Sequence, residues 1–464
     1  MLLKLNKKTK EWSFFMKKEY EELYKQLVDA YYHNHFEEVF AMIMKEKFES
    51  KEEAREILAI LCGVEDEKER DDYSFLQAVV HSIVTHQVRS KIMNKIHICD
   101  TNCEVVEGKA KCQRVCPVDA ILNTPMGNDK WLDETKCIHC GRCIPVCDNH
   151  NFMDTPQFLP LAGLLKETEV YAIVAPAIAG QFGKNVTLDM LREAFVRIGF
   201  SEMIEVALAA DILSLKEALE FNNHIKKEGD FMITSCCCPV WVALMKKVYH
   251  KLIPDFSPSV SPMIAMGRII KKFHPQAKVV FIGPCVAKKA EAKEPDLKGT
   301  IDYVLTFQEL NIIFEALDID PTVQKGLPSV DYASTGGRLY ARTGGVSQAV
   351  YDIVDQLFLE KRKLFQAIHV DGVKECRELL TELETGKVGA SFIEGMGCVG
   401  GCVGGPKAII KKEEGRIAVD EVAYDSAIKI PVNSEVLTKI LDVLEISDIN
   451  ELMEKGSMFE RTFE

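Results

Sequence analysis

The chain has 464 residues, of which 47% are hydrophobic and 27% are charged. This is globular composition, long enough for about two to four domains, and it excludes wholesale disorder, collagen and a coiled coil. The net charge of −13 argues against nucleic acid and anionic membranes as main partners. No apolar run is long enough to span a bilayer, and the lysine-rich N-terminus lacks the apolar stretch of a secretory signal, so we expect a cytoplasmic protein.

The first 90 residues predict a helical N-terminal region, because charged and apolar residues alternate at helical spacing over 19–44 and 51–61. The neighbouring His33 and His35 are interpreted as a solvated helix end rather than a metal site. Residues 91–155 differ, since they hold eight cysteines and several turn-forming residues. We expect them to form a separate small domain.

Residues 156–430 alternate between short apolar runs and helical patterns, which is typical of an α/β domain with mostly parallel sheets flanked by helices. The expected strands are 170–175, 203–208, 231–234, 279–282 and 303–306. The expected helices include 188–198 and 212–225. A helical tail is expected over 431–464.

Clustered cysteines are the most informative feature of the chain, which contains 16 of them. In a long chain without an export signal, such clusters favour metal or redox chemistry over disulfides. The block in 91–155 ends in a C-x2-C-x2-C-x3-C run, in which three thiolates bind one iron–sulfur cube and the fourth points to a second cluster. The preceding four cysteines keep the final Cys-Pro pair but have a stretched first loop. A zinc ribbon is the alternative, although eight thiolates exceed what tetrahedral zinc sites usually use.

The crossed pattern of two-cluster ferredoxins therefore predicts two [4Fe–4S] clusters. One cluster takes the first three cysteines and the last one, which are Cys99, Cys103, Cys112 and Cys147. The other cluster takes the remaining four, which are Cys137, Cys140, Cys143 and Cys116.

Six further cysteines lie in three short motifs: TSCCCPVW at 234–241, GPCVAKKAE at 283–291 and FIEGMGCVGGCVGG at 392–405. The first two follow expected strands, where α/β folds usually build sites. The glycines of the third motif let the backbone approach a cofactor closely. Cys62 and Cys376 stand apart from these motifs and are interpreted as small buried residues.

Behind a two-cluster ferredoxin module, these three motifs resemble in order and rough spacing the signature set of [FeFe] hydrogenases, over about residues 95–410. The resemblance implies an H-cluster, in which a [4Fe–4S] cube is joined through one cysteine thiolate to a two-iron unit carrying CO, cyanide and azadithiolate. Matched motif by motif, the ligands of the cube would be Cys238, Cys285, Cys398 and Cys402, with Cys402 as the bridging thiolate. Lys288 matches a lysine that donates to cyanide, and Met396 matches a methionine beside the two-iron unit. The resemblance implies that further pocket walls are Ala175, Pro176, Pro239 and Pro284.

The first motif departs from the family pattern because it has three cysteines before the proline instead of two. With the register anchored on Pro239, Cys238 is the ligand, Cys237 is the thiol that relays protons, and Cys236 is extra. In the alternative frame, Cys237 is the ligand and Cys236 the relay. Gly283 and Met263 also depart, because they stand where the family often has methionine and glutamine. These departures indicate a divergent subgroup.

The same register implies a proton path, since Glu217, Ser257 and Glu220 fall on the family's glutamate, serine and second glutamate. Glu217 and Glu220 are three residues apart and share one helix face. A chain of titratable side chains is what proton delivery to a buried metal requires. The alternative is that both glutamates are solvated.

The resemblance implies an enzyme that interconverts H2 with protons and electrons. Electrons would pass through the two ferredoxin-type clusters to ferredoxin or another redox subunit, and maturation enzymes would assemble the H-cluster. The alternatives are a hydrogenase-like protein of iron–sulfur assembly and an H2 sensor. Assembly relatives typically lose ligands or the lysine of the second motif, and sensors usually append a signalling domain.

Overall fold

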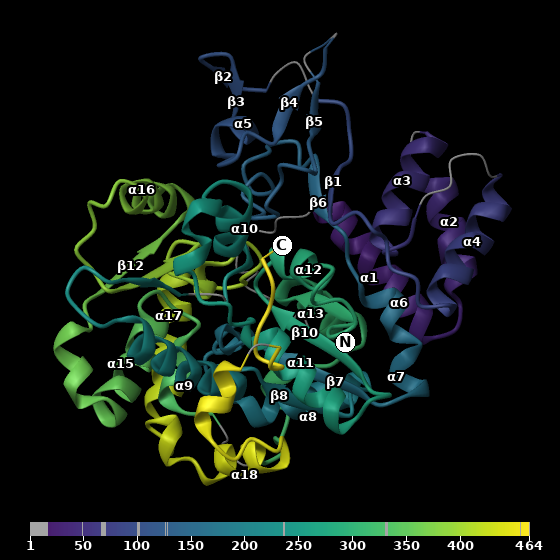
Figure 1. The fold of residues 1–464 in the computed structure, drawn as a ribbon. Helices are drawn as coiled ribbons and strands as arrows, with labels where there is room; N and C mark the ends of the chain where they lie inside the picture. Colours follow the sequence, from purple (N-terminus) through teal and green to yellow (C-terminus); the bar gives the residue numbers. More distant parts are fainter. Residues whose placement is uncertain are drawn as a thin grey trace.

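The structure is a computed structural model that describes residues 17–48, 50–65, 71–99, 103–125, 127, 129–234, 237–329, 333–454 and 456–463. Three regions follow one another along the chain and can be followed by colour in Figure 1. A purple group of helices and a blue module of short strands lie against a larger α/β body. In the described part of the chain, no helix combines the length and apolar character needed to cross a membrane.

The N-terminal region contains the helices α1 (Lys18–Tyr32), α2 (Phe36–Glu46), α3 (Lys51–Leu61) and α4 (Asp72–Val84). The helix expected over 19–44 is divided into two, because the chain turns between α1 and α2, where Asn34 has a φ of 60°. The helix expected over 51–61 is confirmed. Ser50 accepts a hydrogen bond from the backbone N–H of Glu53 and so caps α3.

The cysteine-rich region is built from three antiparallel strand pairs and one short helix. They are β1 (Met93–Lys95) with β6 (Phe152–Asp154), β2 (Val105–Val106) with β3 (Lys109–Ala110), β4 (Ile121–Asn123) with β5 (Lys130–Leu132), and α5 (Lys111–Val115). A small apolar core of its own includes Met93, Ile121, Ile144 and Phe152. The cysteine loops lie around this core.

The α/β body contains two parallel sheets, which confirms the expected fold class. The four-stranded sheet has the order β11 (Tyr303–Thr306), β10 (Lys278–Gly283), β7 (Val170–Val174) and β8 (Glu202–Glu205). The three-stranded sheet has the order β12 (Ala367–Asp371), β13 (Phe392–Met396) and β9 (Met232–Ile233). The strand expected over 203–208 is too long, because α9 (Ala207–His224) begins within that range.

Helices surround the sheets, as the sequence predicts. The helix expected over 188–198 is α8 (Leu188–Ile198). Every residue of α9 from 207 to 221 is buried, and the helix packs against α11 and α15. The remaining helices of the body are α6 (Phe158–Ala162), α7 (Leu164–Glu167), α10 (Pro239–Lys247), α11 (Pro262–Phe273), α12 (Ala287–Glu291), α13 (Phe307–Ala316), α14 (Thr335–Leu339), α15 (Gly345–Leu357), α16 (Val373–Glu384) and α17 (Lys412–Tyr424).

The last segment of the chain is only partly helical, so the expected helical tail is wrong for its final residues. Helix α18 (Glu435–Val443) is followed by a short 3-10 turn, η7 (Ile449–Met453). Residues 456–463 then extend across the α/β body, where Glu460 forms an antiparallel bridge with Ser259. In Figure 1 this yellow segment rises from α18 toward α10 and α12.

Candidate functional site

The first group of cysteines comes from both halves of the cysteine-rich region. Burial and, after it, the neighbouring thiols of Cys147, Cys99 and Cys103 raise the pKa of Cys112 to about 11. The structure thus brings together the four residues that the crossed spacing assigns to one cluster. The loop between Cys99 and Cys103 lies outside the described residues.

The second group lines one small cavity, whose cysteines are Cys116, Cys137, Cys140 and Cys143. Backbone N–H groups point at two of these sulfurs: that of Ala120 donates to Cys116 Sγ at 3.2 Å and that of His139 to Cys137 Sγ at 3.4 Å. Such N–H···S hydrogen bonds are one of the means by which proteins tune iron–sulfur clusters.

A third group of cysteines joins the three motifs of the α/β body. The pKa of Cys398 is raised well above its ordinary value, first by burial and then by the thiols of Cys285, Cys238 and Cys402. The backbone N–H of Gly397 in the third motif donates to Cys238 Sγ in the first at 3.3 Å. Four thiols from separate elements therefore face one buried place.

Local backbone structure explains how the motifs meet. Cys238 is the N-cap of α10, with Pro239 at the first helical position, where a missing N–H costs nothing. The indole N–H of Trp241 donates to the carbonyl of Thr234 at 2.8 Å and so links the first and last residues of the motif. In the third motif Gly401 has a φ of 86°, and a Cβ there would lie 2.7 Å from the backbone nitrogen of Thr343, so only glycine fits.

The second and third cysteine groups adjoin each other. Cys140 is among the thiols that raise the pKa of Cys398. Beside it, a Cβ on Gly141 would lie 3.1 Å from the Pro406 ring. Lys247, at the end of α10, donates to the carbonyl of Cys137 at 2.7 Å. This contact joins the ferredoxin-like module to the α/β body beside the two cysteine groups.

Lys288 is buried beside the third group. Burial lowers its pKa, but Glu291, Cys285 and Cys237 outweigh that effect, so the pKa of Lys288 is raised and the ammonium group is charged. Its Nζ donates to Glu291 Oε2 at 2.7 Å. The other oxygen, Glu291 Oε1, is buried without a hydrogen-bond partner among the described residues. A charged donor and an unsatisfied acceptor at this place fit a polar ligand.

The carboxyl ends of the parallel strands β7 and β10 lie side by side near Lys288. The N–H of Ala175 donates to the carbonyl of Ile282 at 2.9 Å, and Pro176 begins a short 3-10 turn. Pro284 follows Gly283, and its carbonyl accepts the N–H of Lys407 at 3.0 Å. The second motif is thereby joined to the chain that follows the third.

Gly283, which stands where the family often has methionine, lies against the ring of Phe281. A Cβ on Gly283 would lie 2.6 Å from Cε1 of Phe281, so the phenyl ring fills the space that a larger residue at 283 would need. The Phe281 ring also lies 5.7 Å from the Lys288 ammonium nitrogen. Met263 on α11 and Met396 at the end of β13 are both buried.

The predicted proton path is buried, which contradicts the alternative of two solvated glutamates. Glu217 is fully buried and Glu220 is 9% exposed. The Ser257 hydroxyl donates to Glu220 Oε2 at 2.6 Å, while Glu217 accepts a hydrogen bond from the Thr234 hydroxyl. Ser257 and Glu220 are therefore in direct contact, and Thr234 ties Glu217 to the first motif.

Cysteines outside the three groups of four include Cys236, Cys62 and Cys376. Cys236 lies outside the described residues. Cys62 is buried in the N-terminal region, as expected. Cys376 is also buried, but it lies nearer the site than its position in the sequence indicates, because its Sγ donates to the carbonyl of Met396 at 3.3 Å and Cys238 raises its pKa.

Sequence reasoning missed four polar residues around the site. Thr234, Lys216 and Glu291 each had a local signal, since Thr234 and Glu291 are end residues of two motifs and Lys216 stands four residues before Glu220. Glu460 had none, because it reaches α9 from the far end of the chain. It forms an ion pair with Lys216 at 3.3 Å.

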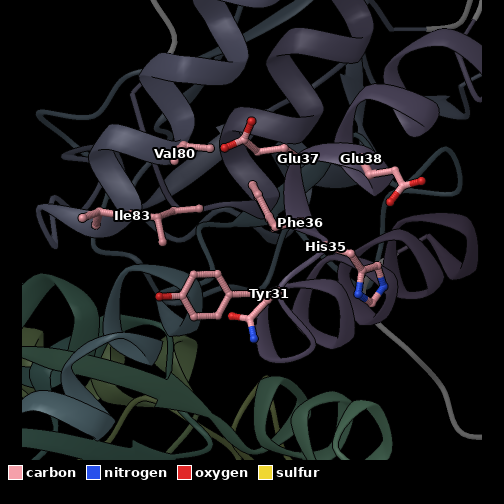
Figure 2. A pocket seen from close by; sticks show the side chains of 9 residues that line it. Tyr31, His35, Phe36, Glu37, Glu38, Val80 and Ile83 are labelled. Carbon is pink, nitrogen blue, oxygen red and sulfur yellow. The ribbon is translucent and has the colours of Figure 1, made fainter.

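A cavity of about 410 Å3 lies elsewhere, among the N-terminal helices. Figure 2 shows Phe36, Val80 and Ile83 on its apolar side and Glu37 and Glu38 at its rim. None of the predicted site residues is among the residues that line it. The cysteine groups, and not this cavity, therefore define the candidate site.

The cysteine groups fit iron–sulfur clusters by the chemistry of their donors. Three sets of four soft thiol ligands, each with at least one backbone N–H group aimed at a sulfur, are the environment that such clusters require. Comparison with known sequences supports this assignment, since the profile of the 4Fe-4S binding domain matches residues 130–150. The chain thus contains an iron–sulfur protein module attached to a parallel α/β domain.

A second profile, described as the C-terminal domain of the iron-only hydrogenase large subunit, matches residues 168–406, more than half of the chain. The chain therefore belongs to the iron-only, or [FeFe], hydrogenase family. A variant of [FeFe]-hydrogenase HydA1 from Chlamydomonas reinhardtii has the same fold, with a TM-score of 0.53 and 21% identity over 64% of this chain and 93% of that one.

Curated relatives are of two kinds. Iron hydrogenase 1 of Clostridium pasteurianum is 26% identical over 69% of this chain and 75% of its own length. The NADP-reducing hydrogenase subunit HndD of Solidesulfovibrio fructosivorans is 28% identical over 59% of this chain, and the match spans only 56% of that relative. Cytosolic iron-sulfur assembly component 3 of Rattus norvegicus is 24% identical over 64% of this chain and 77% of its own length.

Proposed function

We propose that the chain catalyses the reversible interconversion of H2 with protons and electrons. The observation that carries the proposal is the convergence of four thiols from three separate motifs beside the charged Lys288. These thiols would hold the H-cluster and are Cys238, Cys285, Cys398 and Cys402, with Cys402 bridging to the two-iron unit. When bound, the H-cluster supplies the redox chemistry of H2 at irons carrying CO, cyanide and azadithiolate.

The side chains of this protein have distinct tasks in the proposal. Lys288 would donate a hydrogen bond to a cyanide ligand of the bound cluster, and Met396 would help to exclude water. Further walls of the pocket are Ala175, Pro176, Pro239 and Pro284. Cys237 holds an exchangeable proton at Sγ, and the path to the surface continues through Glu217, Ser257 and Glu220.

Electrons would travel through the two ferredoxin-type cysteine groups. The nearness of Cys140 to Cys398 supports the group of Cys116, Cys137, Cys140 and Cys143 as the neighbour of the H-cluster. The group of Cys99, Cys103, Cys112 and Cys147 would then exchange electrons with ferredoxin or another redox subunit. Maturation enzymes would insert the two-iron unit, in the cytoplasm.

A role in iron–sulfur assembly is the second candidate, because some relatives carry that name. It is disfavoured here, since this chain retains all four ligand cysteines and Lys288, whereas such relatives typically lose ligands or the lysine. The two proposals differ in H2 turnover by the purified, matured protein.

The test is an H2 assay with iron analysis on cysteine variants. The matured protein should contain about fourteen iron atoms, eight in the two ferredoxin-type clusters and six in the H-cluster. Cys285→Ser and Cys402→Ser should abolish turnover, because a lost thiolate unseats the cube, while Cys62→Ser should retain it. An iron content near eight in the matured protein, without turnover, would refute the proposal.

A further inference from the structure

A buried lysine lies at the outer end of the predicted proton path. Lys216 stands one helical turn before Glu220 on α9, and none of its surface is exposed. Its Nζ donates to Glu220 Oε1 and pairs with Glu460 Oε1 at 3.3 Å. One ammonium group therefore holds two carboxylates from segments far apart in the sequence.

The segment that brings in Glu460 is fixed to the loop that carries Ser257. The N–H of Val260 donates to the carbonyl of Phe459 and that of Arg461 to the carbonyl of Pro258, each at 2.9 Å. The Arg268 guanidinium of α11 donates to the carbonyl of Glu460 at 2.8 Å. Glu460 is thus held in place by backbone contacts on both sides, rather than lying loosely on the surface.

Among the described residues, Lys216 is the cation that pairs with the Glu460 carboxylate. The neighbouring Arg461 pairs instead with Glu294 and Asp296. Burial lowers the pKa of Lys216, but Glu220 and Glu460 outweigh burial and raise it, so the lysine is charged. Two carboxylates around one ammonium group leave one net negative charge, so the lysine does not neutralise both of them.

We propose that Glu460 is a second outer proton-exchanging group of the path and that Lys216 is the positioning residue that holds Glu220 and Glu460 together. This inference rests on the proposed function. The Glu460 side chain is 16% exposed and takes a proton from an acid in solvent, such as hydronium or a buffer acid. It then releases that proton to Glu220, which passes it on through the Ser257 hydroxyl. Lys216 keeps its three protons and its charge throughout.

The decisive variant is Glu460→Gln, which keeps the size and removes the titrating group. H2 evolution should fall about tenfold, which is less than the hundredfold or more expected when acid–base help is lost completely, because Glu220 still touches water. The solvent isotope effect should rise, since proton delivery becomes limiting, and a small diffusible weak acid should restore part of the rate. Iron content and infrared bands should stay at parental values. The matched control is Glu454→Gln, which removes an exposed charge near the same segment and should change nothing.

Lys216 is tested by two variants that differ in charge. Lys216→Met should lower the rate at least as much as Glu460→Gln, and Lys216→Arg should retain most of it because a guanidinium can hold both carboxylates. A Glu460→Gln protein with the parental rate and isotope effect would overturn the inference, as would equal losses in Lys216→Arg and Lys216→Met. A parent protein without turnover or CO and cyanide bands would instead refute the proposed function itself.

Discussion

Individual thiols in the first motif should have separable roles. Cys237→Ser should leave iron content and CO and cyanide bands intact while turnover falls about a hundredfold or more, because serine holds its proton too tightly to relay it. Cys238→Ser should lower the iron content itself. Iron analysis, infrared spectra and H2 assays on both variants measure the difference.

The control for these variants is Cys376→Ser. Its hydroxyl can donate to the Met396 carbonyl as the thiol does, so turnover should be nearly parental. If Cys237→Ser loses the cluster while Cys238→Ser keeps it, the alternative frame, with Cys237 as ligand and Cys236 as relay, is right. If Cys376→Ser is as damaging as Cys285→Ser, the division of the cysteines is wrong.

Substitutions at Phe281 and Gly283 should have coupled effects on stability. Gly283→Met should lower the free energy of unfolding by about 1–3 kcal/mol, because its Cβ alone would lie 2.6 Å from the Phe281 ring. The double variant with Phe281→Leu should recover part of the loss, since the smaller side chain frees the space. The denaturation midpoints of the parent, the two single variants and the double variant form a double-mutant cycle. Losses of stability that simply add would contradict a coupling between the two residues.

At the scale of elements, the buried helix α9 contains an acid that should make stability depend on pH. Asp211 accepts hydrogen bonds from the N–H of Ser334 at 2.7 Å and from its hydroxyl. Burial is the larger influence and raises the pKa of Asp211 from 3.8 to about 7. Between these values the folded protein holds a proton that the unfolded chain has released, so stability falls as pH rises through this window.

Asp211→Asn replaces the carboxyl group by an amide that does not titrate, so it removes this pH dependence of stability. Between about pH 4 and about pH 7, the free energy of unfolding of the parent should fall by about 4 kcal/mol at most relative to that of the variant. Urea denaturation of both proteins at several pH values measures this difference. A parent that gains stability over the variant as pH rises would show that Asp211 is ionised in the fold.

At the scale of the whole molecule, a buried ionic network joins the cysteine-rich module to the α/β body. Lys289 pairs with Asp154 of β6 at 2.7 Å and with Glu309 of α13 at 3.0 Å. Lys407 pairs with the same Asp154 at 2.6 Å. The network stands immediately after Lys288, so it fixes the second motif relative to the ferredoxin-like module.

Lys289→Met should lower the free energy of unfolding by about 3–5 kcal/mol, because it leaves the buried Glu309 without its lysine and Asp154 with Lys407 alone. Thermal or urea denaturation compares it with Lys298→Met, which removes an exposed lysine from the same region and should be nearly neutral. Equal, small effects of the two substitutions would contradict the structural role of the network.

The sequence predicted features that depend on local pattern. Apolar runs located β7, β10 and β11, and cysteine spacing grouped thiols that the structure does bring together. It missed β12, whose residues 367–371 include His369 and Asp371 and are largely half-buried or exposed. It also missed the contact of Glu460 with Lys216 and the approach of Cys376 to Cys238, because both depend on packing between segments far apart in the chain.

The central claim is that the third cysteine group holds an H-cluster. Infrared spectroscopy of the protein produced with its maturation enzymes tests this claim most directly, because terminal CO and cyanide ligands identify the two-iron unit. We predict CO and cyanide stretching bands that are absent from Cys285→Ser. A protein with full iron–sulfur content but no such bands would contradict the account.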